Sequence, residues 1–233
     1  MIVEPRLQCA GGMRMHDPAY LRRVRELCDA NGAFLVADEI ATGFGRTGTM
    51  FACEQAGISP DLLCLSKGLT GGFLPLAAVL ATQAVYDGFL DDSRERAFLH
   101  SHSYTGNPLA CAAALASLDI FETDGVLARN RGIAARMAAL AAPLAAHPHV
   151  AEVRQAGMVV AFELARGGNR DTPFDPGLRV GLRAYRAALE HGVLLRPLGD
   201  VLYWMPPYCV DEAQLQLLAA TTAATIEEAT ACA

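Results

Sequence analysis

Two short apolar runs, each followed by a charged residue, constrain the fold of this chain more than any other feature. Residues 34–37 (Phe-Leu-Val-Ala) lead into Asp38 and Glu39, and residues 61–66 (Asp-Leu-Leu-Cys-Leu-Ser) lead into Lys67. A glycine-punctuated segment, residues 40–48, follows the first run, and Gly68 follows Lys67. Apolar runs of this length bounded by turn residues are typical of buried strands. We therefore expect two buried strands that each end on a charge.

Lys67 is the only lysine in the chain, since arginine supplies the other 18 of the 19 basic residues. Arginine neither loses its proton near neutral pH nor forms an imine with an aldehyde, whereas a partly desolvated lysine does both. An apolar approach and a glycine-rich exit suit a lysine that forms a Schiff base. The alternative interpretation is that an arginine-rich composition has kept one lysine by chance.

Asp38 is the natural partner of this lysine. A carboxylate at the C-terminal end of a buried parallel strand lies where open α/β sheets bind their ligands. Pyridoxal phosphate chemistry needs a carboxylate that faces the pyridine nitrogen and keeps it protonated. Taken alone, Asp38 is as well explained as a strand-end residue that caps the next turn. Its pairing with Lys67 favours the cofactor interpretation.

The composition excludes several classes of protein. The chain has 233 residues, 52% of them hydrophobic, and a mean hydropathy of +0.24, so it buries a sizeable core. A net charge of −6 gives no basic surface for nucleic acid or anionic membranes. No apolar run reaches membrane-spanning length, and the first residues lack the pattern of a signal peptide. We expect a soluble cytoplasmic protein.

The cysteines indicate a reducing compartment and no metal. They are odd in number and scattered, with no CxxC pair and no cysteine-histidine cluster at ligand spacing. We expect small buried apolar side chains at all seven positions: Cys9, Cys28, Cys53, Cys64, Cys111, Cys209 and Cys232.

The start of the chain predicts a parallel strand-helix-strand unit. Residues 1–5 form the first strand and residues 34–37 the second. Between them Asp17 is placed to cap a helix over residues 18–30, with Pro18 in its first turn. Such connections are right-handed. Further along, residues 74–82 predict another buried strand, residues 84–90 a helical or irregular link, and residues 109–121 an alanine-rich helix.

Hydroxyl and ring donors gather in residues 100–108, directly before the alanine-rich helix. Ser103 and Tyr104 lie at the centre of this stretch. Donors at a helix N-terminus suit a phosphate group. The alternative is an ordinary N-cap loop with two surface histidines. His100 and His102 have no accompanying carboxylate and are poorly spaced for one metal ion.

The pattern changes after a long helix predicted over residues 125–144. Strands at 150–153 and 158–164, an amphipathic helix at 176–191, and strands at 193–196 and 201–204 follow. Gly199-Asp200 forms the turn between the last two strands, and Asp211 caps a closing helix. We therefore expect two domains: residues 1–125, which carry Asp38 and Lys67, and an α+β domain of residues 126–233.

Arg196 stands at the end of the apolar run 192–195, just before Pro197. A guanidinium at such a position grips a carboxylate with two parallel hydrogen bonds. A structural ion pair is the alternative. The aromatic segment 203–208, which begins with Tyr203, is placed to line the same cavity.

Five segments of the chain carry a resemblance. They are residues 10–15 (Ala-Gly-Gly-Met-Arg-Met), 37–48 (Ala-Asp-Glu-Ile-Ala-Thr-Gly-Phe-Gly-Arg-Thr-Gly), 65–72 (Leu-Ser-Lys-Gly-Leu-Thr-Gly-Gly), 100–110, and 196–197 with 203–208. In this order they resemble the class III pyridoxal-phosphate aminotransferases. The similarity is greatest to the branch of biotin synthesis, the adenosylmethionine-8-amino-7-oxononanoate aminotransferases, because Ala41 stands where the wider class usually has Gln.

The resemblance implies a fold and a cofactor. The fold is α/β, the PLP-dependent transferase fold type I (aspartate aminotransferase-like). Residues 1–125 would form the C-terminal part of the large PLP-binding domain, and residues 126–233 the small α+β domain. Lys67 would form the Schiff base with pyridoxal 5'-phosphate and move the proton. Asp38 would pair with the pyridine nitrogen, and Ile40 would pack on one ring face.

The resemblance also implies partners. Ser103, with Tyr104 beside it, matches the stretch that reaches the cofactor phosphate of a partner subunit, so we expect a homodimer with shared active sites. Arg196 would bind the carboxylate of the keto substrate and Tyr203 would line its pocket. The substrates would be S-adenosylmethionine as amino donor, or lysine in its place, and 8-amino-7-oxononanoate as acceptor.

One departure from the family is large. Its members carry about another half-domain before the position of Met1, with the glycine- and serine-containing phosphate loop and the aromatic residue that stacks on the second ring face. We expect a chain that lacks this region to hold the chemical residues with an exposed sheet edge. Two alternatives stay open: another class III omega-amino-acid transaminase, and a catalytically incompetent fragment.

Overall fold

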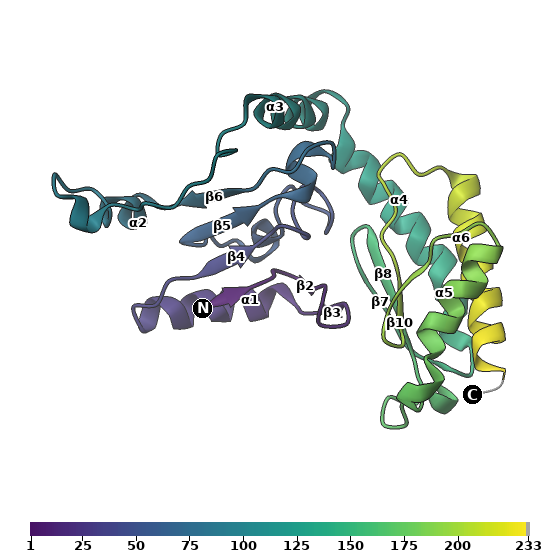
Figure 1. The fold of residues 1–233 in the computed structure, drawn as a ribbon. Helices are drawn as coiled ribbons and strands as arrows, with labels where there is room; N and C mark the ends of the chain where they lie inside the picture. Colours follow the sequence, from purple (N-terminus) through teal and green to yellow (C-terminus); the bar gives the residue numbers. More distant parts are fainter. Residues whose placement is uncertain (232–233) are drawn as a thin grey trace. The chain divides into compact units, whose positions relative to one another are not determined.

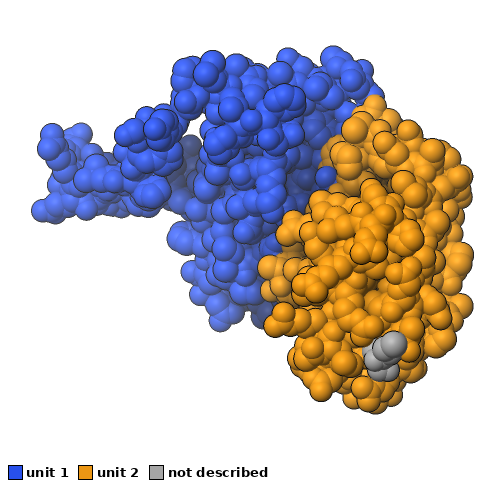
Figure 2. Space-filling model, turned by 45° about the vertical axis from the view of Figure 1, so that its right-hand side comes forward, with its two compact units in different colours: residues 1–6, 16–127 blue, residues 7–15, 128–233 orange. Residues whose placement is uncertain are grey.

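A computed structural model describes residues 1–231, and in it the chain divides into two compact units (Figure 2). The first unit comprises Met1–Arg6 and His16–Leu127, and the second comprises Leu7–Met15 and the chain from Ala128 onward. The division between the units in the middle of the chain falls at residues 127 and 128. The sequence did not predict that residues 7–15 group with the second unit.

The first unit is built on a four-stranded sheet with the order β1-β4-β5-β6 (Figure 1). Its strands are β1 (Ile2–Val3), β4 (Val36–Asp38), β5 (Leu62–Leu65) and β6 (Ala78–Ala81). The first three run parallel, and β6 pairs with β5 in the antiparallel direction. Helix α1 (Pro18–Ala30) connects β1 to β4, and the Asp17 carboxylate accepts a hydrogen bond from the Ala19 N–H at 2.7 Å. The predicted start of this helix is confirmed.

The other elements of the first unit are short helices and one long helix. The 3-10 turns are η1 (Ala52–Ala56), η2 (Lys67–Thr70) and η3 (Arg94–Arg96), and the α-helices are α2 (Gln83–Asp87) and α3 (Pro108–Thr123). Helix α3 extends the predicted helix by one residue at its start and two at its end.

The prediction of a buried strand over residues 74–82 is wrong. Strand β6 is only four residues long, and Val79 and Leu80 on it are 57% and 55% exposed. It is the edge strand of its sheet, so only one neighbouring strand pairs with it. Its apolar sequence therefore belongs to a surface that the described residues leave uncovered.

The second unit is a four-stranded antiparallel sheet with three helices on one face (Figure 1). Its strands follow the order β7 (Val150–Ala156), β8 (Val159–Leu164), β10 (Val201–Trp204) and β9 (Arg196–Leu198). The helices are α4 (Val126–Ala141), α5 (Val180–Glu190) and α6 (Glu212–Thr230), and the 3-10 turns are η4 (Ala142–Ala146), η5 (Arg166–Gly168) and η6 (Pro176–Leu178). Phe162 and Trp204 are fully buried between sheet and helices, and the Trp204 indole N–H donates to Thr222 at 2.9 Å.

Residues 7–15 cover the other face of this sheet. They form a small antiparallel pair, β2 (Leu7–Gln8) and β3 (Arg14–Met15), and their buried side chains Leu7 and Met13 pack on Val159 and Ala161 of β8. These contacts explain why a segment from the start of the chain groups with its second half.

Two predicted elements of the second unit have different bounds. The residues from Gly192 to Leu195 are not in a strand, and β9 begins at Arg196 where the predicted strand ended. The helix predicted over residues 176–191 is interrupted at Arg179, whose φ of 48° is left-handed, so η6 and α5 are separate. The turn at Gly199, with a φ of 58°, is where the sequence placed it.

The cysteines are less uniformly buried than predicted. Cys28 and Cys53 are buried, Cys9 and Cys64 are partly buried, and all four are free thiols. Cys111 and Cys209 are exposed, and Cys232 lies outside the described residues. Among residues 1–231, no helix is both long enough and apolar enough to cross a membrane.

Candidate functional site

Asp38 and Lys67 lie at one edge of the first unit's sheet. Asp38 ends β4 and is paired in register with Cys64 of the parallel neighbour β5. The ladder continues one step further, since the Glu39 N–H donates to the Cys64 carbonyl at 3.0 Å. Lys67 follows Cys64 by three residues and opens η2. The carboxyl ends of the two parallel strands therefore place both residues at the same end of the sheet.

The Asp38 carboxylate is partly buried and also shapes the turn that follows it. Its Oδ1 accepts a hydrogen bond from the Ile40 N–H at 3.1 Å. The turn-capping alternative is thus realised with one of the two oxygens, and a carboxylate has acceptor capacity for further partners. Ile40 is partly buried beside it. Burial first, and then the charge of Asp38, raise the pKa of the Cys64 thiol.

Lys67 is more exposed than expected, and its backbone is left-handed, which the sequence did not predict. Its side chain is exposed in the described chain, whereas the sequence suggested a partly desolvated amine. Its backbone has a φ of 41°, in the left-handed region that residues with a Cβ rarely occupy. Strained backbone of this kind is often found at functional positions, where the surrounding structure holds it.

Glu39 is a residue whose role the sequence did not reveal. Its carboxylate is completely buried and accepts hydrogen bonds from the N–H groups of Ala52, at 2.6 Å, and Cys53, at 2.8 Å. It thereby closes the segment 40–51 into a loop at the N-terminus of η1. Burial raises the pKa of Glu39. The strand alternation of side chains explains why Asp38 and Glu39, adjacent in sequence, turn to opposite sides.

The donor-rich segment before α3 has the form of a capping loop. Asn107 caps α3 and accepts hydrogen bonds from the N–H groups of Leu109 and Ala110, at 3.0 and 3.1 Å. Two backbone donors of the helix N-terminus are therefore already engaged. Ser103 and Tyr104 are exposed, Tyr104 to 75%. What this segment offers to a phosphate group is thus its hydroxyls.

Arg196 and Tyr203 lie opposite each other in the second unit. They are paired in register across the antiparallel strands β9 and β10, so their side chains stand on one face of the sheet. Tyr203 is partly buried and packs with Leu7 and Met13 on the face away from the helices. Arg196 is exposed. The geometry presents a guanidinium and a phenol side by side.

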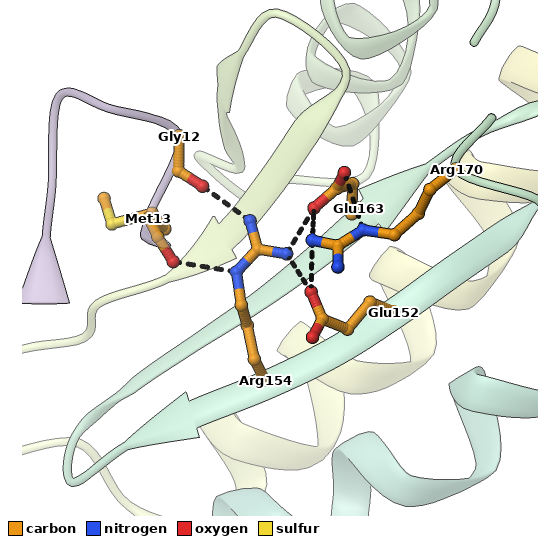
Figure 3. A network of polar contacts seen from close by, with 6 residues as sticks. All are labelled: Gly12, Met13, Glu152, Arg154, Glu163 and Arg170. Carbon is orange, nitrogen blue, oxygen red and sulfur yellow. Dashed lines mark hydrogen bonds and ion pairs between the residues drawn. The ribbon is translucent and has the colours of Figure 1, made fainter. Parts of the chain in front are cut away.

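A network of ion pairs on the same face holds residues 7–15 in place (Figure 3). The largely buried Arg154 donates to the carbonyl oxygens of Gly12, at 2.5 Å, and Met13, at 2.8 Å. Its guanidinium also pairs with Glu152 at 2.6 Å and Glu163 at 2.5 Å. The hydrogen bond from Arg170 and then that from Arg154 lower the pKa of Glu163 to about 2. No local pattern indicates these contacts to Gly12 and Met13, because they lie 142 and 141 residues from Arg154 in the chain.

No metal centre accompanies these residues. Within residues 1–231, no group of three or more histidine, cysteine, aspartate or glutamate side chains is arranged to hold a metal ion.

The sequence pattern described as Aminotransferase class-III matches residues 1–226 of the chain. The chain belongs to the class III aminotransferase family. Enzymes of this family depend on pyridoxal phosphate in general. This cofactor requires a carboxylate, an amine and donors for its phosphate. The chain offers these types in Asp38, in Lys67 at the same end of the sheet, and in the exposed hydroxyls of Ser103 and Tyr104.

Curated relatives within the class III family include two bacterial adenosylmethionine-8-amino-7-oxononanoate aminotransferases. The protein of Nitratidesulfovibrio vulgaris is 50% identical over 222 residues, which are 95% of this chain and 41% of the relative. The protein of Geobacter sulfurreducens is 48% identical over 219 residues, which are 94% of this chain and 48% of the relative. The chain thus spans about half the length of the curated relatives that it matches.

Solved structures of class III enzymes share this fold. The adenosylmethionine-8-amino-7-oxononanoate aminotransferase of Methanocaldococcus jannaschii superposes with a TM-score of 0.93 at 37% identity, covering 98% of this chain and 53% of that one. An (S)-enantioselective omega-transaminase of Thermomicrobium roseum gives 0.91 at 30% identity, covering 98% and 50%. The expected α/β fold of fold type I, represented by the part of it that this chain spans, is confirmed.

Proposed function

We propose that this chain carries the reactive lysine and the C-terminal half of a transaminase of biotin biosynthesis. The enzyme would transfer an amino group from S-adenosylmethionine to 8-amino-7-oxononanoate and give 7,8-diaminononanoate. The observation that carries the proposal is the placement of Asp38 and Lys67, the chain's one lysine, after the carboxyl ends of two neighbouring parallel strands. The names of relatives at 48–50% identity support the substrates.

The residues of the first unit would hold pyridoxal 5'-phosphate. Lys67 would bind its aldehyde carbon, Asp38 its protonated pyridine nitrogen, and Ile40 one face of its ring. Ser103 and Tyr104 would bind the phosphate with their hydroxyls. The cofactor supplies an electron sink for the carbanion that forms when the amino donor loses a proton. Lys67 would be the group of this chain that holds and returns that proton.

Arg196 and Tyr203 would recognise the keto substrate. A guanidinium forms two parallel hydrogen bonds to a carboxylate, which suits the acid end of 8-amino-7-oxononanoate. Tyr203, directly opposite on the neighbouring strand, would provide an aromatic wall for the alkyl chain. Because a lysine in place of Arg196 offers no planar fork, it would keep the charge and lose part of the recognition.

The assembly we propose is a cytoplasmic homodimer with shared active sites. Ser103 and Tyr104 lie in an exposed loop, and exposed apolar side chains accompany them in the same unit, among them Phe98, Leu99 and Leu109 at 66%, 84% and 72%. Exposed apolar groups gathered on one unit are typical of a surface that a partner covers.

A different class III omega-amino-acid transaminase is the second candidate. The likeness to an omega-transaminase of Thermomicrobium roseum, at a TM-score of 0.91, favours it to the extent that both kinds of enzyme share this fold. The higher sequence identity of the biotin-pathway relatives favours the first candidate. A third possibility is a chain that is incompetent by itself, because it spans about half of its relatives.

The visible absorption spectrum of the 233-residue chain with pyridoxal phosphate tests cofactor binding. We expect an imine band in the wild type that borohydride reduction fixes on Lys67, and no such product with Lys67→Ala. The same absence in the wild type would assign the function to a longer protein. Amino transfer by the competent protein, profiled with 8-amino-7-oxononanoate and simple keto acids as acceptors, then separates the two enzyme candidates.

A further inference from the structure

The left-handed backbone of Lys67 has to be held by its surroundings. An L-residue at a φ of 41° returns to the ordinary helical or extended region unless its neighbours prevent it. The residue that follows, Gly68, has no positive φ, so conformational freedom is not the reason for a glycine there. A glycine is needed at this position because a side chain would have no room.

Phe44 fills the space beside Gly68. A Cβ built on Gly68 would lie 2.7 Å from the Phe44 Cβ and 2.9 Å from its Cγ, which is closer than real Cβ contacts. Phe44 therefore packs directly on the backbone next to Lys67. It is 2% exposed, and its ring lies within 5.7 Å of the Phe51 ring and 6.2 Å of the Phe121 ring, measured between centroids.

Ser117 holds the same glycine from another side. Its hydroxyl donates to the Gly68 carbonyl oxygen at 3.1 Å, a contact between residues 49 apart in the chain. Ser117 lies on α3, and Phe121 follows it by four residues on the same side of the helix. Helix α3 thus reaches the backbone after Lys67 directly through Ser117, and indirectly through Phe121 and Phe44.

We propose that Ser117 is a positioning residue for Lys67. By fixing the Gly68 carbonyl while Phe44 fixes the Gly68 Cα, it keeps Lys67 left-handed and so aims its amine. The functional meaning rests on the proposed function, in which Lys67 is the reactive amine. The same helix begins at Pro108, four residues after Tyr104, so one element would set both the aim of the lysine and the place of the hydroxyls proposed to bind phosphate.

The single lysine makes the geometry directly measurable. Labelling with ¹⁵N-lysine gives one backbone amide signal, and the coupling between its amide and α protons depends on φ. In the cofactor-free 233-residue chain, we expect Ser117→Ala to move or split this signal and to change the coupling. Ser117→Thr, which keeps the hydroxyl, should restore the wild-type position.

The matched control is Thr123→Ala on the same helix. The Thr123 hydroxyl donates to the Asp119 carbonyl oxygen within α3 and to the neighbouring Asp124 carboxylate, so its loss should leave the Lys67 signal in place. An unchanged signal and coupling in Ser117→Ala would overturn the proposal. If circular dichroism shows that Ser117→Ala is unfolded, Ser117→Cys is used in its place, because it is similar in size to serine and carries a weaker hydrogen-bond donor.

A cofactor measurement separates this inference from the proposed function. With pyridoxal phosphate below saturation, we expect Ser117→Ala to lower the fraction of Lys67 fixed by borohydride about tenfold, the effect of one misplaced hydrogen-bonded contact on a binding equilibrium. A shifted amide signal without any covalent product in the wild type would refute the proposed function and leave the positioning role standing. An unaffected fraction with an unshifted signal would refute the positioning role alone.

Discussion

Glu39 holds the N–H of Cys53 at 2.8 Å from a completely buried carboxylate oxygen, and its other oxygen holds the N–H of Ala52. Replacing Glu39 with Ala leaves both buried donors without an acceptor and opens a cavity. We expect a loss of about 3 kcal/mol in the free energy of unfolding. Glu39→Gln keeps the shape and one acceptor and should lose about 1 kcal/mol. Urea unfolding measures both, with the exposed Glu26→Gln as control, expected to stay within about 0.5 kcal/mol.

Two buried or paired glutamates give the two units opposite pH dependence. The pKa of Glu39 is raised above its ordinary value by burial, so its contribution is complete below that value and is lost as pH rises through the raised pKa. The pKa of Glu163 is lowered to about 2, so its contribution is complete above its ordinary value of 4.5 and is lost as pH falls toward 2.

Hydrogen exchange resolved to the first and second units, followed against pH, measures this prediction. Glu39→Gln should remove the loss of protection that the first unit shows as pH rises. Glu163→Gln should remove the loss of protection that the second unit shows as pH falls. Identical pH profiles in both units would contradict it.

The left-handed backbone at Lys67 is predicted to lower the stability of the folded chain. Lys67→Gly removes the cost of a Cβ at a φ of 41°. Its free energy of unfolding should therefore be about 1 kcal/mol higher than that of Lys67→Ala, which keeps the Cβ. The usual order holds in a helix, where Arg183→Gly in α5 should be about 1 kcal/mol less stable than Arg183→Ala. Equal stability of Lys67→Gly and Lys67→Ala would mean that the backbone is not strained there.

Local signals in the sequence were sufficient for much of the fold. Helix α1 begins and ends where Asp17, Pro18 and Asn31 predict, and β10 has the predicted bounds 201–204. Asp211 caps α6 as expected, accepting from the Gln214 N–H at 2.8 Å. The position of Asp38 at the carboxyl end of a buried parallel strand followed from the same kind of reasoning, because the apolar run before it stops at this residue.

Contacts between distant residues account for what the sequence did not predict. Arg154 and Met13, joined by a hydrogen bond, are 141 residues apart, and nothing in either segment identifies the other. The exposure of β6 depends on its place at the sheet edge, whereas its composition only says that it is apolar. That Glu39 turns inward beside Asp38 depends on where the loop 40–51 returns, which no local pattern encodes.

Arg154 is predicted to be the residue that ties residues 7–15 to the second unit. Arg154→Ala removes two hydrogen bonds to backbone carbonyls and leaves Glu152 and Glu163 without their most buried partner, so about 3 kcal/mol should be lost. Arg170→Ala is the matched control. Its guanidinium pairs with the same two carboxylates but is 51% exposed, so its loss should be under about 1 kcal/mol. Faster hydrogen exchange in residues 7–15 should accompany the first substitution only.

Two glycines in the helices of the second unit test its packing in opposite directions. Gly181 lies at the start of α5, where its N–H donates to the Asp200 carboxylate at 3.1 Å. A Cβ there would lie 2.0 Å from the Gly199 carbonyl oxygen, in the backbone of the turn between β9 and β10. Because backbone cannot rotate aside as a side chain does, Gly181→Ala should push α5 from this turn at a loss of about 3 kcal/mol.

Gly132 lies in the interior of α4, and a Cβ there would meet nothing within 4 Å. Gly132→Ala therefore only reduces the conformational freedom of the unfolded chain and should add about 1 kcal/mol of stability. Urea unfolding of the two variants side by side should separate them by about 4 kcal/mol, the sum of these two effects. Because β9 and β10 carry Arg196 and Tyr203, the displacement in Gly181→Ala should also disturb the pairing of these two residues, and Gly132→Ala should leave it intact. Similar stabilities would contradict the close packing of α5 on the turn that orients the predicted carboxylate-binding arginine.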